Sequence, residues 1–184
     1  PVDVVLTDGQ KALREATRVA ATWPSRLRVA VNISPIQFRR RALTLDVLGA
    51  LGRSGLRSDR LELEITEGVL LDDTDATLAT LAQLREIGVR IAMDDFGTGY
   101  SSLGYLRRFA FDKVKIDKSF VQDIGDSADS TAIVRAVTSL CSSLGITTVA
   151  EGVETVLQCE RLRREGCDQF QGWLFGRPVR ESEV

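Results

Sequence analysis

Six short apolar runs of this chain end in a polar or charged residue, and this recurrence constrains its fold more than any other feature. In the clearest run, Ala92 and Met93 lead into the adjacent carboxylates Asp94 and Asp95, and a loop with two glycines follows. The other five runs end at Asn32, at Glu64, at Lys115 with Asp117, at Glu151 and at Gln171. Helical patterns separate the runs, which predicts parallel strands joined by right-handed crossovers. Polar side chains at the carboxyl ends of such strands are typical of a β/α barrel.

The expected elements follow from the spacing of apolar residues along the chain. We expect strands over residues 27–33, 61–66, 89–94, 113–117, 146–151 and 168–171. We expect helices over residues 9–23, 35–51, 75–87, 102–108, 128–144 and 154–165. No low-complexity tract or Pro/Gly/Ser-rich linker divides the chain, so we expect residues 1–184 to form one domain.

The two faces of the predicted strands favour a barrel over an open sheet. In residues 113–117, Lys113 and Lys115 share one face, whereas Val114 and Ile116 share the other. An open doubly wound sheet is covered by helices on both faces and therefore needs apolar residues on both. We instead expect an α/β fold of the TIM-like (β/α)8 barrel type with a polar mouth. A complete barrel of this kind takes about 250 residues, so we expect the 184-residue chain to lack part of it.

Composition excludes several classes of function. The chain contains no histidine, which removes Ser-His-Asp chemistry and the usual zinc sites, so a catalytic metal would need oxygen ligands and would be Mg²⁺, Mn²⁺ or Ca²⁺. The formal net charge of -2 predicts no binding to DNA or RNA through phosphates. No apolar run approaches the roughly 20 residues of a membrane-spanning helix. The three cysteines lack metal-type spacing and are expected to be buried, reduced thiols, which indicates a cytoplasmic setting.

The strand-end residues together indicate a metal site. Four carboxylates and an amide oxygen could form a cage for one or two divalent cations. These groups belong to Asn32, Glu64, Asp94, Asp95 and Glu151. Two such ions about 3.5–4 Å apart activate water and hold a phosphate during in-line displacement. Lys115 could orient that water, and Glu151 could accept its proton.

Each residue also has a structural interpretation. A strand-end Asp or Glu is commonly a helix cap or an ion-pair partner, Asn32 could cap the following helix, and Lys115 and Asp117 could pair with each other. Glu67 could belong to a capping arrangement, and the two loop glycines could only supply turn geometry. A site is favoured because the polar residues share one end of six successive strands. A Schiff-base aldolase that uses Lys115 is a third interpretation, but nearby carboxylates oppose the lowered pKa that it needs.

Six motifs resemble those of the EAL-domain family over essentially the whole chain and in the same order. They are residues 31–34 (VNIS), 63–67 (LEITE), 94–103 (DDFGTGYSSL), 115–120 (KIDKSF), 150–154 (AEGVE) and 169–175 (QFQGWLF). Members of this family are phosphodiesterases of bacterial second-messenger signalling. They hydrolyse cyclic di-GMP to linear pGpG on a TIM-like barrel, using Mg²⁺ or Mn²⁺. The resemblance implies the same fold, substrate and two-metal site for this chain.

The resemblance also implies a role for each matching residue. Asn32, Glu64 and Asp94 would bind one metal ion, and Asp94 with Asp95 would serve the second. Lys115 would position the nucleophilic water, and Glu151 would be the general base or a ligand through water. The other matching positions would bind substrate or support the site, and these are Asp117, Glu154, Gln171, Glu67 and the loop residues Phe96, Gly97, Thr98 and Gly99. Glu67 would steady that loop, which in the family links metal binding to dimerisation, so we expect a homodimer.

The chain departs from the family pattern in one respect, because it does not contain the glutamate-alanine-leucine signature. That signature should lie on the first barrel strand, upstream of the helix that contains Leu13 and Glu15, and we expect this strand and the last helix to be missing. The signature glutamate is a metal ligand in the family, so we expect the 184-residue chain to be poorly active. The alternative is a non-catalytic cyclic di-GMP receptor or protein-interaction module that keeps the fold. In a full-length protein the domain could be fused to sensory or cyclase domains and tethered to a membrane.

Overall fold

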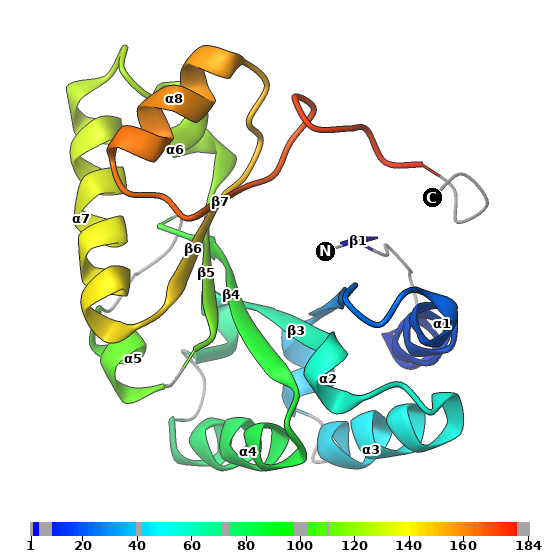
Figure 1. Ribbon diagram of the computed structural model, residues 1–184. Coiled ribbons are helices and arrows are strands. Elements are labelled where there is room, and N and C mark those ends of the chain that lie inside the picture. The colour runs from blue at the N-terminus through cyan, green and yellow to red at the C-terminus, as the bar shows by residue number, and fades with distance from the viewer. Residues whose placement is uncertain are drawn as a thin grey trace. The chain divides into compact units, whose positions relative to one another are not determined.

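The computed structural model describes residues 2–3, 9–39, 42–70, 74–97, 103–109 and 111–179. The chain divides into two compact units. The first comprises Pro1–Met93 with Leu103–Phe111, and the second comprises Asp94–Ser102 with Asp112–Val184. Both units alternate strands with helices (Figure 1). Within the described ranges, no helix has the length and apolar character needed to cross a membrane.

The first unit is built on parallel strands with helices in the connections. In chain order its elements are β1 (Val2–Asp3), α1 (Gly9–Thr22), β2 (Val29–Ile33), α2 (Pro35–Arg39), α3 (Leu43–Ser54), the 3-10 helix η1 (Ser58–Arg60), β3 (Leu61–Thr66), the 3-10 helix η2 (Glu67–Leu70), α4 (Thr74–Ile87), β4 (Arg90–Phe96) as far as Met93, and α5 (Leu103–Arg108). β2 pairs with both β1 and β3 in parallel, and its register with β3 runs from Val29 opposite Leu61 to Ile33 opposite Ile65. α1 packs against α3 and β2.

The buried guanidinium of Arg60 holds three of these elements together. Arg60 is 8% exposed. Its Nε atom donates to the Leu27 carbonyl at 2.7 Å, and its Nη2 atom donates to the Ala20 carbonyl at 2.7 Å. Ala20 lies in the last turn of α1, where a helix leaves carbonyl groups without intrahelical partners. These bonds therefore fix the end of α1 to the segments that lead into β2 and β3.

The second unit continues the parallel pattern. It contains β4 from Asp94 onward, β5 (Lys113–Ile116), α6 (Lys118–Gln122), α7 (Ala128–Leu144), β6 (Thr147–Ala150), α8 (Val156–Arg164) and β7 (Gln169–Phe170). β6 pairs with β5 and with β7, both in parallel. The yellow helix α7 packs against α6 and β6 (Figure 1). Thr155 and Gln158 form a capping box at the start of α8. All three cysteines are buried free thiols, as expected.

The expected helix over residues 35–51 is two helices, α2 and α3. The reason is the spacing of the residues that are buried. Phe38 is buried from α2 and Leu43 begins the buried face of α3. Five residues turn a helix by about 500°, so in one continuous helix these two side chains would point about 140° apart. Arg40 and Arg41 lie outside the described residues.

The six expected strands are present, and their ends differ from expectation by a few residues. A further strand, β1, covers two residues that sequence reasoning left unassigned. β4 continues through Asp95 to Phe96 instead of ending at Asp94. The short helix α6 was not expected, because five residues are too few to show a helical period.

Candidate metal centre

Asp94 and Asp95 lie at the carboxyl end of β4. Asp94 is 8% exposed, and its Oδ1 atom accepts a hydrogen bond from the Asp95 backbone N–H at 3.1 Å. Asp95 has a φ of 52°, a left-handed conformation that is uncommon outside glycine. Backbone conformations of this kind persist only where the surroundings require them, and they cluster at functional sites. The pair is therefore held in a conformation that strand geometry alone does not produce.

Lys115 joins Asp94 to Glu151. It lies on β5 and is 4% exposed. Its Nζ atom donates to Asp94 Oδ1 at 2.9 Å and to Glu151 Oε1 at 2.8 Å. Glu151 follows β6 directly, and its backbone N–H donates to the Ile116 carbonyl at 3.1 Å, which holds it beside the end of β5. Three residues from three strand ends are thus joined by two ion pairs inside one unit.

The electrostatics of the cluster follow from burial and like charge. Burial raises the pKa of Glu151, the Lys115 ammonium opposes that shift, and the charges of Asp94 and Asp95 add to it. Burial also raises the pKa of Asp95, and the negative charges of Asp94 and Asp117 act in the same direction. Both carboxylates would therefore gain from a further cation beside them.

The donor set of this cluster fits a hard divalent cation. Asp94, Asp95 and Glu151 each offer a carboxylate oxygen, and these oxygens all lie within 4.8 Å of one another. Three carboxylates against one ammonium leave an excess of negative charge. Oxygen donors without imidazole or thiolate suit Mg²⁺ or Mn²⁺ better than Zn²⁺.

Asn32 and Glu64 lie next to each other within the first unit. They are register partners on the parallel strands β2 and β3. Glu64 is 2% exposed, whereas Asn32 is exposed. A buried glutamate beside an amide at two neighbouring strand ends is the arrangement expected of these two candidate ligands.

The remaining predicted site residues have local roles that the structure describes. The Asp117 carboxylate caps α6 by accepting from the Ser119 backbone N–H at 2.9 Å. Burial alone would raise the pKa of Asp117, but the hydrogen bonds from Ser119 and Lys118 outweigh it and lower that pKa. Glu154 is exposed, and its backbone N–H donates to Gln158 Oε1 at 2.9 Å.

Other predicted positions are held through the backbone or in the core. The Gln171 backbone N–H donates to the Ala150 carbonyl at 2.8 Å. Glu67 begins η2 and is half-buried. Phe96 is buried at the end of β4, and Gly97 follows it with a φ of 101°. Thr98 and Gly99 lie outside the described residues.

Sequence reasoning assigned no role to Gly152, which follows Glu151 in the second unit. It has a φ of 67°, and a Cβ atom placed on it would lie 2.7 Å from the Cβ atom of Lys118. The signal was present in the sequence, since a glycine follows the strand-end carboxylate directly. Its partner Lys118 belongs to α6, which was not expected, so the contact could not be inferred.

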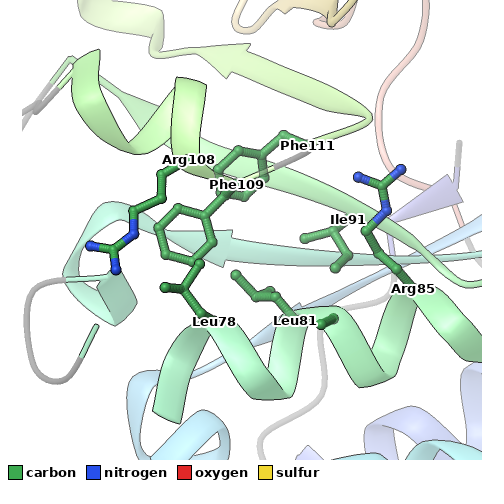
Figure 2. A pocket seen from close by; sticks show the side chains of 8 residues that line it. Leu78, Leu81, Arg85, Ile91, Arg108, Phe109 and Phe111 are labelled. Atoms are coloured by element: carbon green, nitrogen blue, oxygen red, sulfur yellow. The ribbon is translucent and has the colours of Figure 1, made fainter. Parts of the chain in front are cut away.

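A cavity of about 160 Å³ lies within the first unit. Figure 2 shows its apolar lining, which comes from α4, β4 and the segment that follows α5. Leu81, Ile91, Phe109 and Phe111 are buried around it. Arg108 lies at its edge, with Nη2 3.4 Å from Asp75 Oδ1. No residue of the predicted site lines this cavity.

Comparisons with known proteins identify the family to which this chain is similar. A family model described as the EAL domain matches residues 8–178. The bifunctional diguanylate cyclase/cyclic di-GMP phosphodiesterase MucR of Pseudomonas aeruginosa is 42% identical over 185 residues, which cover 98% of this chain and 27% of MucR. The solved structure of the MucR phosphodiesterase with cyclic di-GMP matches 95% of this chain and 72% of that chain, with a TM-score of 0.91 and 42% identity. A manganese and cyclic di-GMP complex of BlrP1 from Klebsiella pneumoniae matches 93% of this chain and 44% of that chain, with a TM-score of 0.86 and 37% identity.

These matches confirm the expected fold class, an α/β fold of the TIM-like barrel type. They cover only part of each relative, so the activities of the whole relatives are not established for this chain. The chain spans 21% to 27% of the length of the first curated relatives that it matches.

Proposed function

Because the chain belongs to the EAL domain family, we propose that it forms a metal-dependent phosphodiesterase domain that hydrolyses cyclic di-GMP to linear pGpG. The observation that carries this proposal is the cluster of Asp94, Asp95 and Glu151, with Lys115 paired to two of its members. The names of the relatives and the manganese and cyclic di-GMP complexes of solved neighbours support the substrate and the metal.

The proposed metal is Mg²⁺ or Mn²⁺, held by oxygen ligands. Asn32, Glu64 and Asp94 would bind one ion, and Asp94 with Asp95 would bind the second. When bound, such ions lower the pKa of a water molecule and stabilise negative charge on phosphoryl oxygens. The excess negative charge of the cluster, in which Asp94 is buried, supports this assignment.

Lys115 and Glu151 would act on the attacking water. The Lys115 ammonium is fixed between two carboxylates, so its N–H bonds have a set direction and can orient a water molecule beside Asp94. The raised pKa of Glu151 brings it closer to the value that suits a proton acceptor at neutral pH. Glu151 would therefore take the proton of the water as the oxygen attacks phosphorus.

The remaining expectations belong to this proposal. Asp117, Glu154 and Gln171 would support the site or contact the substrate. Glu67 would steady the loop that begins at Phe96 and Gly97, and a homodimer would couple to that loop. The domain would work in the bacterial cytoplasm, fused in a longer protein to sensory or cyclase domains.

The test is turnover of cyclic di-GMP by a form that carries the glutamate-alanine-leucine strand, compared with the same form bearing Asp94→Asn, Lys115→Ala or Glu151→Ala. We expect each substitution to abolish formation of pGpG, while Lys11→Ala, at an exposed lysine of α1, keeps turnover. Full hydrolysis by any of the three variants would overturn the role given to that residue. Binding of cyclic di-GMP without hydrolysis by the unsubstituted form would instead make the domain a receptor.

A further inference from the structure

The short helix α6 lies against the two glycines that follow the carboxylates of the cluster. Gly152 comes directly after Glu151, and a Cβ atom placed on it would lie 2.7 Å from Lys118 Cβ. Gly97 comes two residues after Asp95, and a Cβ atom there would lie 2.6 Å from the ring carbon Cε2 of Phe120. Both contacts are closer than side-chain carbons approach each other, so the backbone of each segment packs directly on α6.

The same helix is fixed to the strand that carries Lys115. α6 begins at Lys118, and the Asp117 carboxylate caps it through the Ser119 N–H. Glu151 is in turn fixed to this strand, because its backbone N–H donates to the Ile116 carbonyl at 3.1 Å. One rigid turn of helix therefore touches the chain after Asp95, the chain after Glu151 and the end of β5.

We propose that α6 is a spacer that sets the separation between the Asp94–Asp95 pair and Glu151, and that Lys118 and Phe120 are positioning residues acting through Gly152 and Gly97. The consequence for metal binding rests on the proposed function. α6 touches no substrate in this account; it determines where the carboxylates of two strand ends meet.

The size of the effect follows from the contact at Gly152. Ordinary van der Waals contact with a Cβ atom begins at 3.4 Å, so a methyl group at position 152 must move α6 or the Glu151 segment by about 0.7 Å. The Cβ atom of Lys118 is attached to the helix backbone and cannot rotate away, whereas the Phe120 ring can turn. Metal–ligand distances tolerate about 0.2 Å. Gly152→Ala is therefore the more severe change, and it exceeds that tolerance several-fold.

Gly145 offers a matched control. It ends α7 with a φ of 70°, close to the 67° of Gly152, and a Cβ atom placed on it meets nothing within 4 Å. Alanine at either position takes a similarly unfavourable positive φ, but only Gly152→Ala collides with α6. A difference between the two variants then reports the contact with Lys118 and not the strain of the backbone.

The experiment measures Mn²⁺ binding by the metal-free protein and, without metal, the backbone amide spectrum. We expect Gly152→Ala to weaken Mn²⁺ binding by about 10-fold or more, the range seen when groups that hold metal ligands are changed. Gly145→Ala should keep the wild-type affinity. In the metal-free spectrum, Gly152→Ala should shift the amide signals of Asp94 and Lys115, and Gly145→Ala should shift neither.

Removing the Cβ atom of Lys118, with which the alanine collides, should restore the metal affinity lost in Gly152→Ala. Lys118→Gly in the Gly152→Ala background should recover most of the lost affinity and return the Asp94 amide signal toward its wild-type position. Equal effects of the two alanine variants, or a double variant as impaired as Gly152→Ala, would overturn the spacer. A wild-type protein that binds no Mn²⁺ would overturn the proposed function instead, and the metal-free spectra alone would then decide the role of α6.

Discussion

Replacing Lys115 by methionine tests whether its ammonium is the internal counter-ion of the carboxylate cluster. The substitution keeps most of the length of the unbranched side chain and removes a charge that lies 2.9 Å from Asp94 Oδ1 and 2.8 Å from Glu151 Oε1. Removing one partner of a buried ion pair costs about 3–5 kcal/mol, because the other charge stays buried. We therefore expect Lys115→Met to lower the free energy of unfolding of the metal-free protein substantially at neutral pH.

Proton binding limits this cost and makes it depend on pH. Glu151 has an ordinary pKa of 4.5, which the fold raises. Protonating a carboxyl of pKa 4.5 at pH 7 costs about 3.4 kcal/mol, and at pH 5 about 0.7 kcal/mol. The variant raises the folded-state pKa of Glu151 further above its unfolded value, so the folded state is favoured at low pH and loses stability as pH rises through that interval. The penalty should be about 3 kcal/mol at pH 7 and about 1 kcal/mol at pH 5.

The assay is urea unfolding in a chelator, followed by far-ultraviolet circular dichroism at both pH values. Lys11→Met is the matched control, because it removes the charge of an exposed lysine of α1 that has no role in the cluster, and it should change stability by less than about 0.5 kcal/mol. Adding Glu151→Gln to Lys115→Met should recover about 1–2 kcal/mol at pH 7. A Lys115→Met protein as stable as wild type, or a penalty that does not shrink at pH 5, would refute the reasoning.

Three further predictions concern residues outside the carboxylate cluster. Arg60→Met should lower the free energy of unfolding by about 2–3 kcal/mol, because backbone carbonyls lose a charged donor. Thermal unfolding checks this, with Arg57→Met at an exposed arginine as the control. Equal effects of the two substitutions would contradict the prediction. Asp117→Ala should cost about 1 kcal/mol at pH 7 through the lost helix cap. The folded-state pKa of Asp117 lies below the ordinary 3.8, so the stabilisation from the cap is present above that pH and disappears as pH falls. The urea midpoints of Asp117→Ala and wild type should therefore converge in acid. Burial raises the pKa of Cys141 to about 12 and also raises that of Cys167, so an aromatic disulfide reagent should label these thiols only after denaturation, and rapid labelling of the folded protein would show that they are exposed.

Much of the site could be predicted because the period of a strand is short and strict. Alternation placed Lys115 on a face opposite Val114 and Ile116, and the carboxyl ends of parallel strands lie at one edge. That was enough to bring Lys115 to Asp94 and Glu151. The neighbouring positions of Asn32 and Glu64 follow from the register of β2 with β3 in the same way.

The features that could not be predicted depend on contacts between residues that no short-range sequence pattern indicates. The break between α2 and α3 is set by which side chains are buried, Phe38 in one helix and Leu43 in the next. The left-handed backbone of Asp95 is not marked by any pattern in the neighbouring residues. The contact between Gly152 and Lys118 joins residues far apart in the sequence, and neither reveals the other.

The measurement that tests the central claim most directly is hydrolysis of cyclic di-GMP in water enriched in heavy oxygen. It should be run with Mn²⁺ or Mg²⁺ and with a chelator, on this chain and on a form that carries the glutamate-alanine-leucine strand. We predict linear pGpG with one heavy oxygen on its terminal phosphate, formed by the longer form only when metal is present, and little product from this chain. Product that forms equally in the chelator, or no product from the longer form with either metal, would contradict the account.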